Sequence, residues 1–308
     1  MFEITIQDFA ESFGCDITDF SQACINSIKE KNFSYEVIEG KRRDDLILEI
    51  LKRIDSDKQI IASEERKDIW YKGWEENLNL FNKSGCDIET LIPKFIRKNQ
   101  IIRYNGSYIL PKNPQFELDY ITIFRTWLFQ KYFNDVNTIY EFGCGTGFNL
   151  VLIESLFKNK ELHGLDFVQS SVDLVNKIGS SYNCNIKGHL FDMIKPDFAF
   201  NLAEESAVFT FGAIEQLAGQ FEEFLKFLLE KKPKLVIHIE PTVELYDENN
   251  LSDYLAIKFH KKRGYTTNYL PQLRELDSLK KLNLIKVKRL FFGSLFMEGY
   301  MLFIWQPV

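Results

Sequence analysis

Three glycines and an aspartate have the spacing of a nucleoside-binding turn. Gly143, Gly145 and Gly147 follow the apolar pair Ile139 and Tyr140 at every second position, and Asp166 comes 19 residues after the last glycine. Glycines let a chain turn sharply off a strand and bring its backbone close to a ligand. The first N–H groups of a helix after such a turn bind a polar or anionic group. A carboxylate that closes the next strand can accept two hydrogen bonds from a ribose diol.

The elements around the turn follow from the apolar pattern. Residues 148–157 read as a helix and residues 161–165 as a strand that ends at Asp166. A dinucleotide fingerprint, G-x-G-x-x-G, needs its third glycine one residue later than this sequence has it, and Phe148 stands where that fingerprint has Gly or Ala. The spacing therefore disfavours a nicotinamide cofactor. The alternative is a glycine turn that binds no ligand. In that case the position of Asp166 at the end of the next strand would be a coincidence.

The arrangement E-x-G-x-G-x-G, which begins at Glu141, resembles the class I S-adenosylmethionine-dependent methyltransferases. The resemblance covers residues 115–308. It implies an α/β fold with a doubly wound, seven-stranded, mostly parallel sheet and an antiparallel C-terminal hairpin. It also implies S-adenosyl-L-methionine as the cofactor, with the glycine turn beside its methionine part and Asp166 on its ribose.

The third strand of this pattern, residues 185–190, ends at Phe191, Asp192 and Met193. By the resemblance, Asp192 accepts a hydrogen bond from the adenine amine, and Phe191 or Met193 packs on the ring. Asp197 is close enough in sequence to compete with Asp192 for this role. The residues predicted to bind the cofactor are Glu141, Gly143, Gly145, Gly147, Asp166, Phe167, Asp192 and Met193.

Polar residues follow the fourth predicted strand, residues 207–211. In a doubly wound sheet, ligands bind at the carboxyl ends of the strands where the strand order reverses. We place that reversal between the first and fourth strands, so Glu215 and Gln216 should face the methyl group and the substrate. Capping of the following helix is the alternative for both residues.

The fifth predicted strand contains two polar residues in an otherwise apolar run. His238 and Glu240 are two positions apart, so their side chains point to the same face near the carboxyl end. A buried parallel strand is usually apolar throughout. We therefore predict His238 as a general base, with Glu240 or Glu215 orienting it or holding the substrate; a histidine satisfied within the core is the alternative.

Residues 1–114 read as a mainly helical substrate-binding or lid region with a small hairpin. Helices are expected at about residues 16–29, 43–54 and 63–81, each with an apolar stripe. The third stripe includes Trp70 and Trp74, which pack in a core or belong to a lid over the substrate side.

A hairpin is expected at Asn105 and Gly106, and a helix rich in aromatic residues at 116–133. In the family, the segment before the first strand often crosses the cofactor pocket. Tyr104, Tyr108 and Tyr120 are therefore candidates to contact cofactor or substrate, with plain packing as the alternative.

Composition and charge narrow the class of protein. The net charge of −6 over 308 residues disfavours nucleic acid, since nucleic-acid-binding proteins normally carry a basic face. Five cysteines without a C-x-x-C pair indicate neither a disulfide framework nor a zinc site. No N-terminal signal and no apolar run of spanning length stand out, so we expect no membrane partner and a cytoplasmic protein. Nothing in the sequence indicates an oligomeric state.

The chemistry implied by the resemblance is in-line transfer of a methyl group, which needs no metal because the sulfonium already activates the carbon. The protein then aligns the reactants and excludes water. The motif N/D-P-P-Y/F of amino-methylating DNA enzymes is absent after the fourth strand. We expect O-methylation of a small polar or sugar-type acceptor; N-methylation of a peptide or protein and a non-catalytic methyltransferase-like subunit are the alternatives.

Overall fold

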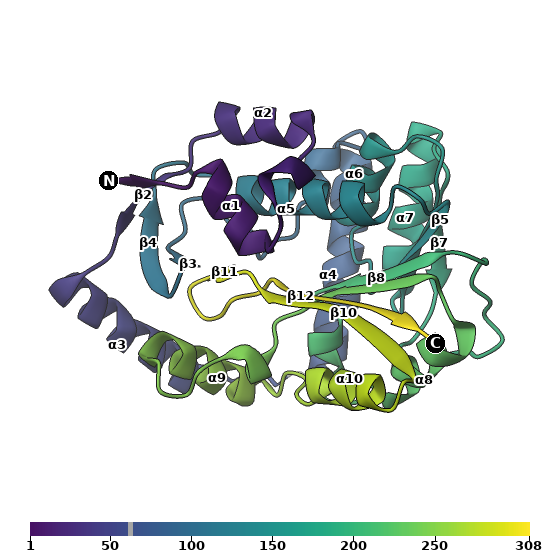
Figure 1. Cartoon of the computed structure of the whole chain (residues 1–308). Helices are drawn as coiled ribbons and strands as arrows, with labels where there is room; N and C mark the ends of the chain where they lie inside the picture. Colours follow the sequence, from purple (N-terminus) through teal and green to yellow (C-terminus); the bar gives the residue numbers. More distant parts are fainter. Residues whose placement is uncertain (61–63) are drawn as a thin grey trace.

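A seven-stranded sheet carries the larger part of the protein (Figure 1). The structure is a computed structural model that describes residues 1–60 and 64–308. The strand order is β10-β12-β9-β8-β5-β6-β7; all neighbours from β9 to β7 are parallel, whereas β12 is antiparallel to both β9 and β10. The predicted doubly wound sheet with its antiparallel C-terminal strand is confirmed. These strands are β5 (Thr138–Phe142), β6 (Glu161–Asp166), β7 (Ile186–Leu190), β8 (Ala207–Phe211), β9 (Leu235–Ile239), β10 (Leu282–Arg289) and β12 (Met301–Pro307).

The strand order reverses beside β5, because the chain runs from β5 outward to β6 and β7 and then returns to β8 on the other side. Alternate residues of the central strands are buried against helices on both faces, which forms two apolar cores. On one face lie α5 (Phe116–Tyr132), α6 (Phe148–Leu156) and α7 (Gln169–Tyr182), and on the other lie α8 (Glu222–Lys231) and α10 (Tyr269–Ser278).

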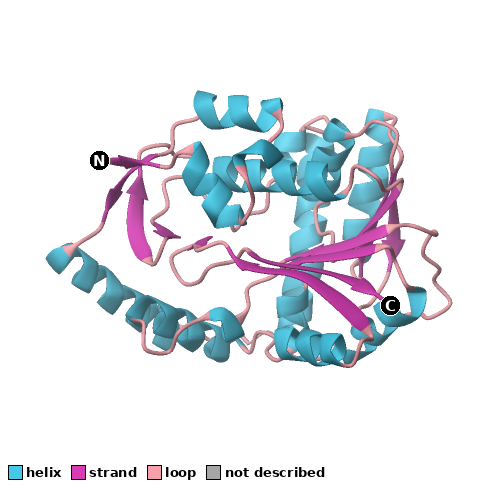
Figure 2. Ribbon diagram, viewed as in Figure 1, coloured by secondary structure: helices cyan, strands magenta, loops and turns pink. Residues whose placement is uncertain are grey.

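The N-terminal region combines helices with a second, smaller sheet (Figure 2). The hairpin predicted at Asn105 and Gly106 is present, with Tyr104 opposite Ser107. Three further strands of two to four residues complete the sheet, and the last of them comes from the C-terminal part of the chain. The sequence does not predict them because they are too short to show alternation. The elements are β1 (Phe2–Glu3), β2 (Ser34–Val37), β3 (Ile102–Tyr104), β4 (Ser107–Pro111), β11 (Phe292–Gly293), α1 (Ile6–Phe13), α2 (Gln22–Glu30), α3 (Gly40–Ser56) and α4 (Glu64–Lys83).

Element boundaries differ from the predicted ones by a few residues. The helix expected from residue 16 begins at Gln22, because Ser21 caps it with a hydrogen bond to the Cys24 N–H. The predicted start of the third helix, Ser63, lies outside the described residues. In the C-terminal hairpin, β10 ends at Arg289, and Phe292 pairs with Tyr104 in the small sheet.

A cluster of buried ion pairs ties the small sheet to the large one. Arg289 of β10 donates to Asp253 of α9 (Leu251–Arg263) at 2.6 Å and to Glu298 at 2.6 Å. Arg103 of β3 lies 3.3 Å from the same Asp253 carboxylate. All four side chains are at most 11% exposed. The buried charges of Arg103 and Arg289 therefore keep their carboxylate partners only while both sheets are in place.

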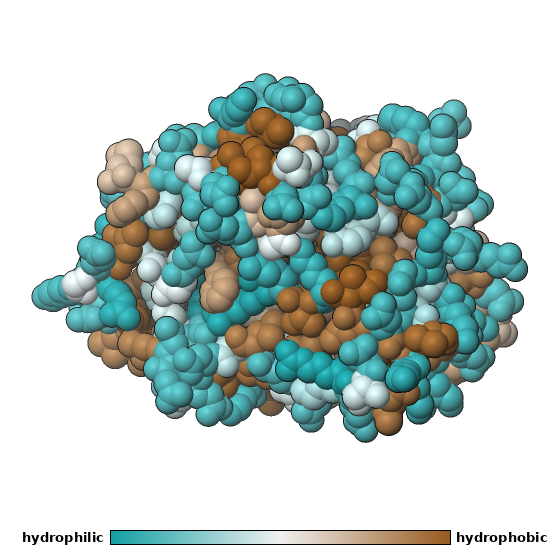
Figure 3. Space-filling view, viewed as in Figure 1, coloured by the Kyte–Doolittle hydropathy of each residue, from teal (hydrophilic) through white to brown (hydrophobic). Residues whose placement is uncertain are grey.

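Hydrophilic residues cover most of the face seen in Figure 3, with apolar patches between them. Among the helices of the described residues, none combines the length and the apolar composition that crossing a membrane requires.

Replacement of Arg289 by Met should lower the free energy of unfolding by about 3–5 kcal/mol, because two buried carboxylates lose their main cation. Chemical denaturation measures the change. Lys94→Met is the matched control: its ion pair with Glu76 is exposed, so it should change stability by less than about 1 kcal/mol. Equal effects of the two substitutions would contradict the role of the cluster.

Candidate functional site

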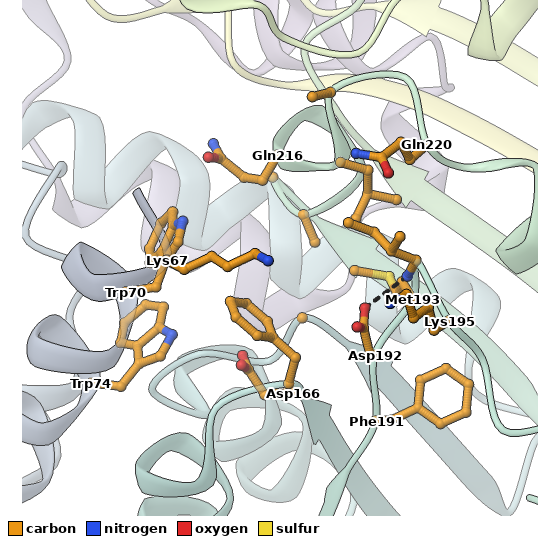
Figure 4. Close-up of a pocket in the computed structure, with 17 residues that line it drawn as sticks. Lys67, Trp70, Trp74, Asp166, Phe191, Asp192, Met193, Lys195, Gln216 and Gln220 are labelled. Carbon is orange, nitrogen blue, oxygen red and sulfur yellow. Dashed lines mark hydrogen bonds between the residues drawn. The ribbon is translucent and has the colours of Figure 1, made fainter. Parts of the chain in front are cut away.

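A pocket of about 410 Å³ lies at the carboxyl ends of the central strands, where the strand order reverses. Its walls come from the ends of β5 to β8 and from α4 of the N-terminal region (Figure 4). The lining residues are Lys67, Trp70, Trp74, Gly143, Asp166, Phe167, Phe191, Asp192, Met193, Ile194, Lys195, Gly212, Ala213, Gln216, Leu217, Ala218 and Gln220.

The glycine turn borders this pocket through Gly143. Gly143, Gly145 and Gly147 all have positive φ (72°, 53° and 73°), a conformation that side chains disfavour. A Cβ on Gly143 would collide with the Cβ of Ala213, and one on Gly145 would come within 2.9 Å of the Trp74 indole. Of the three, only Gly143 lines the pocket itself.

Asp166 lines the pocket at the end of β6, and its contact with a ribose stays a prediction. Its Oδ2 accepts a hydrogen bond from the Gly145 N–H (3.1 Å), and its Oδ1 accepts one from the Val168 N–H (3.0 Å). Burial raises the pKa of Asp166 to about 6, although these backbone donors oppose the shift. The carboxylate thus holds the turn and the following loop together while it lines the cavity with Phe167.

The opposite end of the pocket is formed by the residues after β7. Asp192 and Met193 line it, and Asp192 also accepts a hydrogen bond from the Ile194 N–H at 2.8 Å. Asp197, the competing carboxylate, is absent from the lining and accepts from the Ala199 N–H. Phe191 lines the pocket too, but its ring packs at 5.0 Å on that of Phe142. Contact of these residues with a cofactor stays a prediction.

Glu141 lies beneath the turn and does not line the pocket. It is 1% exposed, and its Oε1 accepts from the Asn149 amide at 2.6 Å. Asn149 in turn accepts from Arg125, whose guanidinium stacks on the Phe148 ring at 3.7 Å. Burial raises the pKa of Glu141 to about 8. The predicted direct contact with the cofactor is therefore corrected: in this structure Glu141 braces the start of α6.

The prediction of His238 as a general base is wrong for this structure. His238 is completely buried, its Nδ1 lies 2.9 Å from the Thr210 hydroxyl, and its Nε2 lies 2.7 Å from the Tyr269 hydroxyl. Burial lowers its pKa to about 3, so the ring stays neutral. It does not line the pocket, because its side chain points to the face of the sheet that α10 covers. His238 instead fits the alternative: a core histidine whose two ring nitrogens both have hydrogen-bond partners.

Glu240 is buried behind the pocket and holds the loop after β8. Its Oε1 accepts from the Thr210 hydroxyl (2.6 Å) and the Ala213 N–H (3.1 Å), and its Oε2 accepts from the Glu215 N–H (3.2 Å). Burial raises its pKa to about 6. Neither Glu240 nor Glu215 lines the cavity, whereas Gln216 does, with its amide bound to the Glu215 carboxylate at 2.6 Å. The predicted catalytic roles of the two glutamates are corrected to support of this loop.

The three tyrosines proposed as substrate contacts are not brought to the pocket. Tyr104, Tyr108 and Tyr120 are at most 3% exposed and are absent from its lining. The Tyr120 ring stacks on Phe292 at 3.6 Å, and its hydroxyl lies 2.5 Å from that of Ser12. Packing, the alternative reading, is what the structure shows.

Sequence reasoning missed Lys67 of α4 and left Trp70 and Trp74 undecided between a core and a lid. All three line the pocket. They are three and then four residues apart, so they lie on one face of the helix. This spacing is the feature of the sequence that indicates a shared role. Gln220, Ile194 and Lys195 were missed as well, because loop residues carry no periodicity.

Replacement of Glu240 by Gln should weaken binding of S-adenosylhomocysteine about tenfold. An amide can accept at only one of the two oxygen positions, so one backbone N–H of the loop loses its partner, at a cost of about 1–3 kcal/mol. Titration calorimetry measures the affinity. Glu222→Gln, an exposed carboxylate at the start of α8, is the matched control; an unchanged affinity in Glu240→Gln would contradict the support of the loop.

No protein-family model matches the chain, and no curated protein matches its sequence. Solved structures do match. The geranyl diphosphate C-methyltransferase of Streptomyces coelicolor A3(2), determined with S-adenosyl-L-homocysteine, is 11% identical, with a TM-score of 0.49 over 80% of this chain and 99% of that one. The methyltransferase domain of bacterial CtHen1 is 15% identical, with a TM-score of 0.45 over 61% and 96%.

An O-methyltransferase of neocarzinostatin biosynthesis, determined with S-adenosylmethionine and 2-hydroxy-5-methyl naphthoic acid, is 10% identical, with a TM-score of 0.42 over 63% of this chain. The chain spans 58% of that enzyme's length. These similarities are too low to carry a function over. The chain's own strand order, with the glycine turn beside the reversal, agrees with the doubly wound fold that the resemblance in sequence implies.

Proposed function

We propose that the protein is an S-adenosylmethionine-dependent methyltransferase. The observation that carries the proposal is a single pocket that brings together Gly143, Asp166 and Asp192, from the ends of three neighbouring strands. Their types suit the three parts of this cofactor: bare backbone for the methionine part, a carboxylate for the ribose diol and a second carboxylate for the adenine amine.

The pocket also fits the cofactor in size and in its apolar surface. Its volume of about 410 Å³ lies within the range of about 300–1,000 Å³ for small-molecule sites. Met193 and Ile194 offer apolar surface beside Asp192 for a planar base. Gly143 lines the cavity with bare backbone, and a Cβ there would collide with the Cβ of Ala213. When bound, the cofactor supplies a methyl group already activated by its positive sulfur.

The residues of the chain then hold the acceptor in line and keep water out. Hydrogen-bond donors that line the pocket are the amides of Gln216 and Gln220 and the amines of Lys67 and Lys195. His238 is not available as a base, so an acceptor hydroxyl would have to lose its proton to another group. The amide and amine donors of the pocket would stabilise an acceptor oxygen that is already ionised. We therefore propose a small polar acceptor that is methylated on such an oxygen.

The test is transfer of isotope-labelled methyl from S-adenosylmethionine into extract of the source cells, fractionated into small metabolites, polysaccharide, protein and nucleic acid. We expect label in the small-molecule fraction with wild-type protein and background with Asp166→Ala. Label in the protein fraction alone would replace the proposed acceptor by a peptide or protein. If neither S-adenosylmethionine nor S-adenosylhomocysteine bound to the wild type, the methyltransferase proposal would fail.

Cofactor affinity should fall as the pH drops below about 6. Burial raises the pKa of Asp166 to about 6, so at lower pH the free protein protonates the carboxyl that the ribose diol needs as an acceptor. The dissociation constant of S-adenosylhomocysteine, measured by calorimetry from pH 8 to 5, should then rise up to about tenfold per pH unit below 6. Asp166→Asn should bind weakly with a flatter profile; a wild-type profile as flat as that of the variant would contradict the assignment.

A further inference from the structure

One wall of the pocket comes from α4, outside the seven-stranded sheet. Lys67, Trp70 and Trp74 reach the cavity from one face of this helix (Figure 4). The two indoles stack on each other, with ring centroids 5.3 Å apart and planes inclined by 26°. The benzo ring of Trp74 lies so close to Gly145 that a Cβ there would come within 2.9 Å of it. Trp74 is thus held directly beside the glycine turn, with Trp70 stacked on it.

The place of these rings relative to the cofactor follows from the proposed function, on which this inference rests. With the ribose at Asp166 and the adenine toward Asp192, the remaining methionine part has to extend along the glycine turn. Gly143 lines the pocket there, and Trp74 covers the neighbouring Gly145. Gly143, Trp70 and Trp74 line the same cavity, so the sulfur of a cofactor bound in this way comes within reach of the indole wall.

The charged side chains of the pocket give little net preference for a cation. They are two lysines, Lys67 and Lys195, and two aspartates, Asp166 and Asp192, whose formal charges cancel. Indole rings attract cations through the negative potential of their faces, more strongly than other aromatic side chains. The indole wall can therefore attract a cation even though the formal charges of the lysines and aspartates cancel.

We propose that Trp70 and Trp74 recognise the positive charge of the sulfonium and make the pocket prefer S-adenosylmethionine to its neutral product, S-adenosylhomocysteine. Loss of the charge on methyl transfer weakens this contact. The wall therefore favours exchange of product for fresh cofactor.

The test is the ratio of the dissociation constants of the two ligands, measured by calorimetry on the wild type, Trp70→Leu and Trp74→Leu. Preference for S-adenosylmethionine should fall roughly 3- to 10-fold in each variant. Sinefungin, which carries an amine in place of the methylated sulfur, should lose affinity as S-adenosylmethionine does, because charge is the recognised property. Both ligands are measured on the same variant. A general loosening of α4 would weaken both by the same factor, so it would not change the ratio.

Phe167→Leu is the matched control, because Phe167 is an aromatic residue of the pocket next to the ribose-binding Asp166. It should weaken both ligands equally and leave their ratio unchanged. If the tryptophan variants also left the ratio unchanged while both ligands still bound, the inference would be overturned and the proposed function would stand. If the wild type bound neither ligand, the proposed function itself would fail.

Discussion

The carboxylate of Asp166 is the constraint on which the rest of the site depends. It accepts the N–H of Gly145 in the turn after β5 and the N–H of Val168 in the loop after β6, so it fixes two adjacent strand ends with one side chain. Ser171 adds a hydrogen bond from its hydroxyl to the Gly145 carbonyl at 2.6 Å. A turn of three glycines would lose much conformational entropy on folding, and these contacts offset that loss where the chain must stay close to a ligand.

Support for the pocket continues on both faces of the sheet. On the α5 and α6 side, Glu141, Asn149 and Arg125 form a buried chain of contacts beneath the turn. On the α10 side, Thr210 links His238 to Glu240, which carries the loop after β8. Buried polar groups are stable only when partnered. The polar residues that interrupt these apolar strands thus act on loop position, one layer behind the cavity.

The fold could be predicted from the sequence to a large extent, because burial on both faces makes the central strands mostly apolar runs bounded by glycine and polar loops. Asp166 and Asp192 line the pocket because each comes at the end of a strand that the sequence pattern marks, while their contact with a cofactor stays a prediction. His238 and Glu240 lie at the end of β9, but His238 is buried against α10 and the Glu240 carboxylate is bound by the loop after β8. Sequence periodicity tells which residues share a face, not which face borders the cavity.

The N-terminal region was harder to predict for a different physical reason. Its small sheet needs β11, nearly 190 residues beyond β3 in sequence, and no local pattern encodes a pairing at that distance. Trp70 and Trp74 form an apolar stripe that looks the same whether it meets a core or a ligand pocket. Tyr120 is buried because Phe292 arrives from the far end of the chain to stack on it.

A crystal structure of the protein with S-adenosylhomocysteine tests the central claim most directly. The adenine should lie beside Asp192 and Met193, both ribose hydroxyls should bind Asp166, and the sulfur should lie between Gly143 and the indoles of α4. A ligand bound elsewhere, or one whose ribose does not touch Asp166, would contradict it.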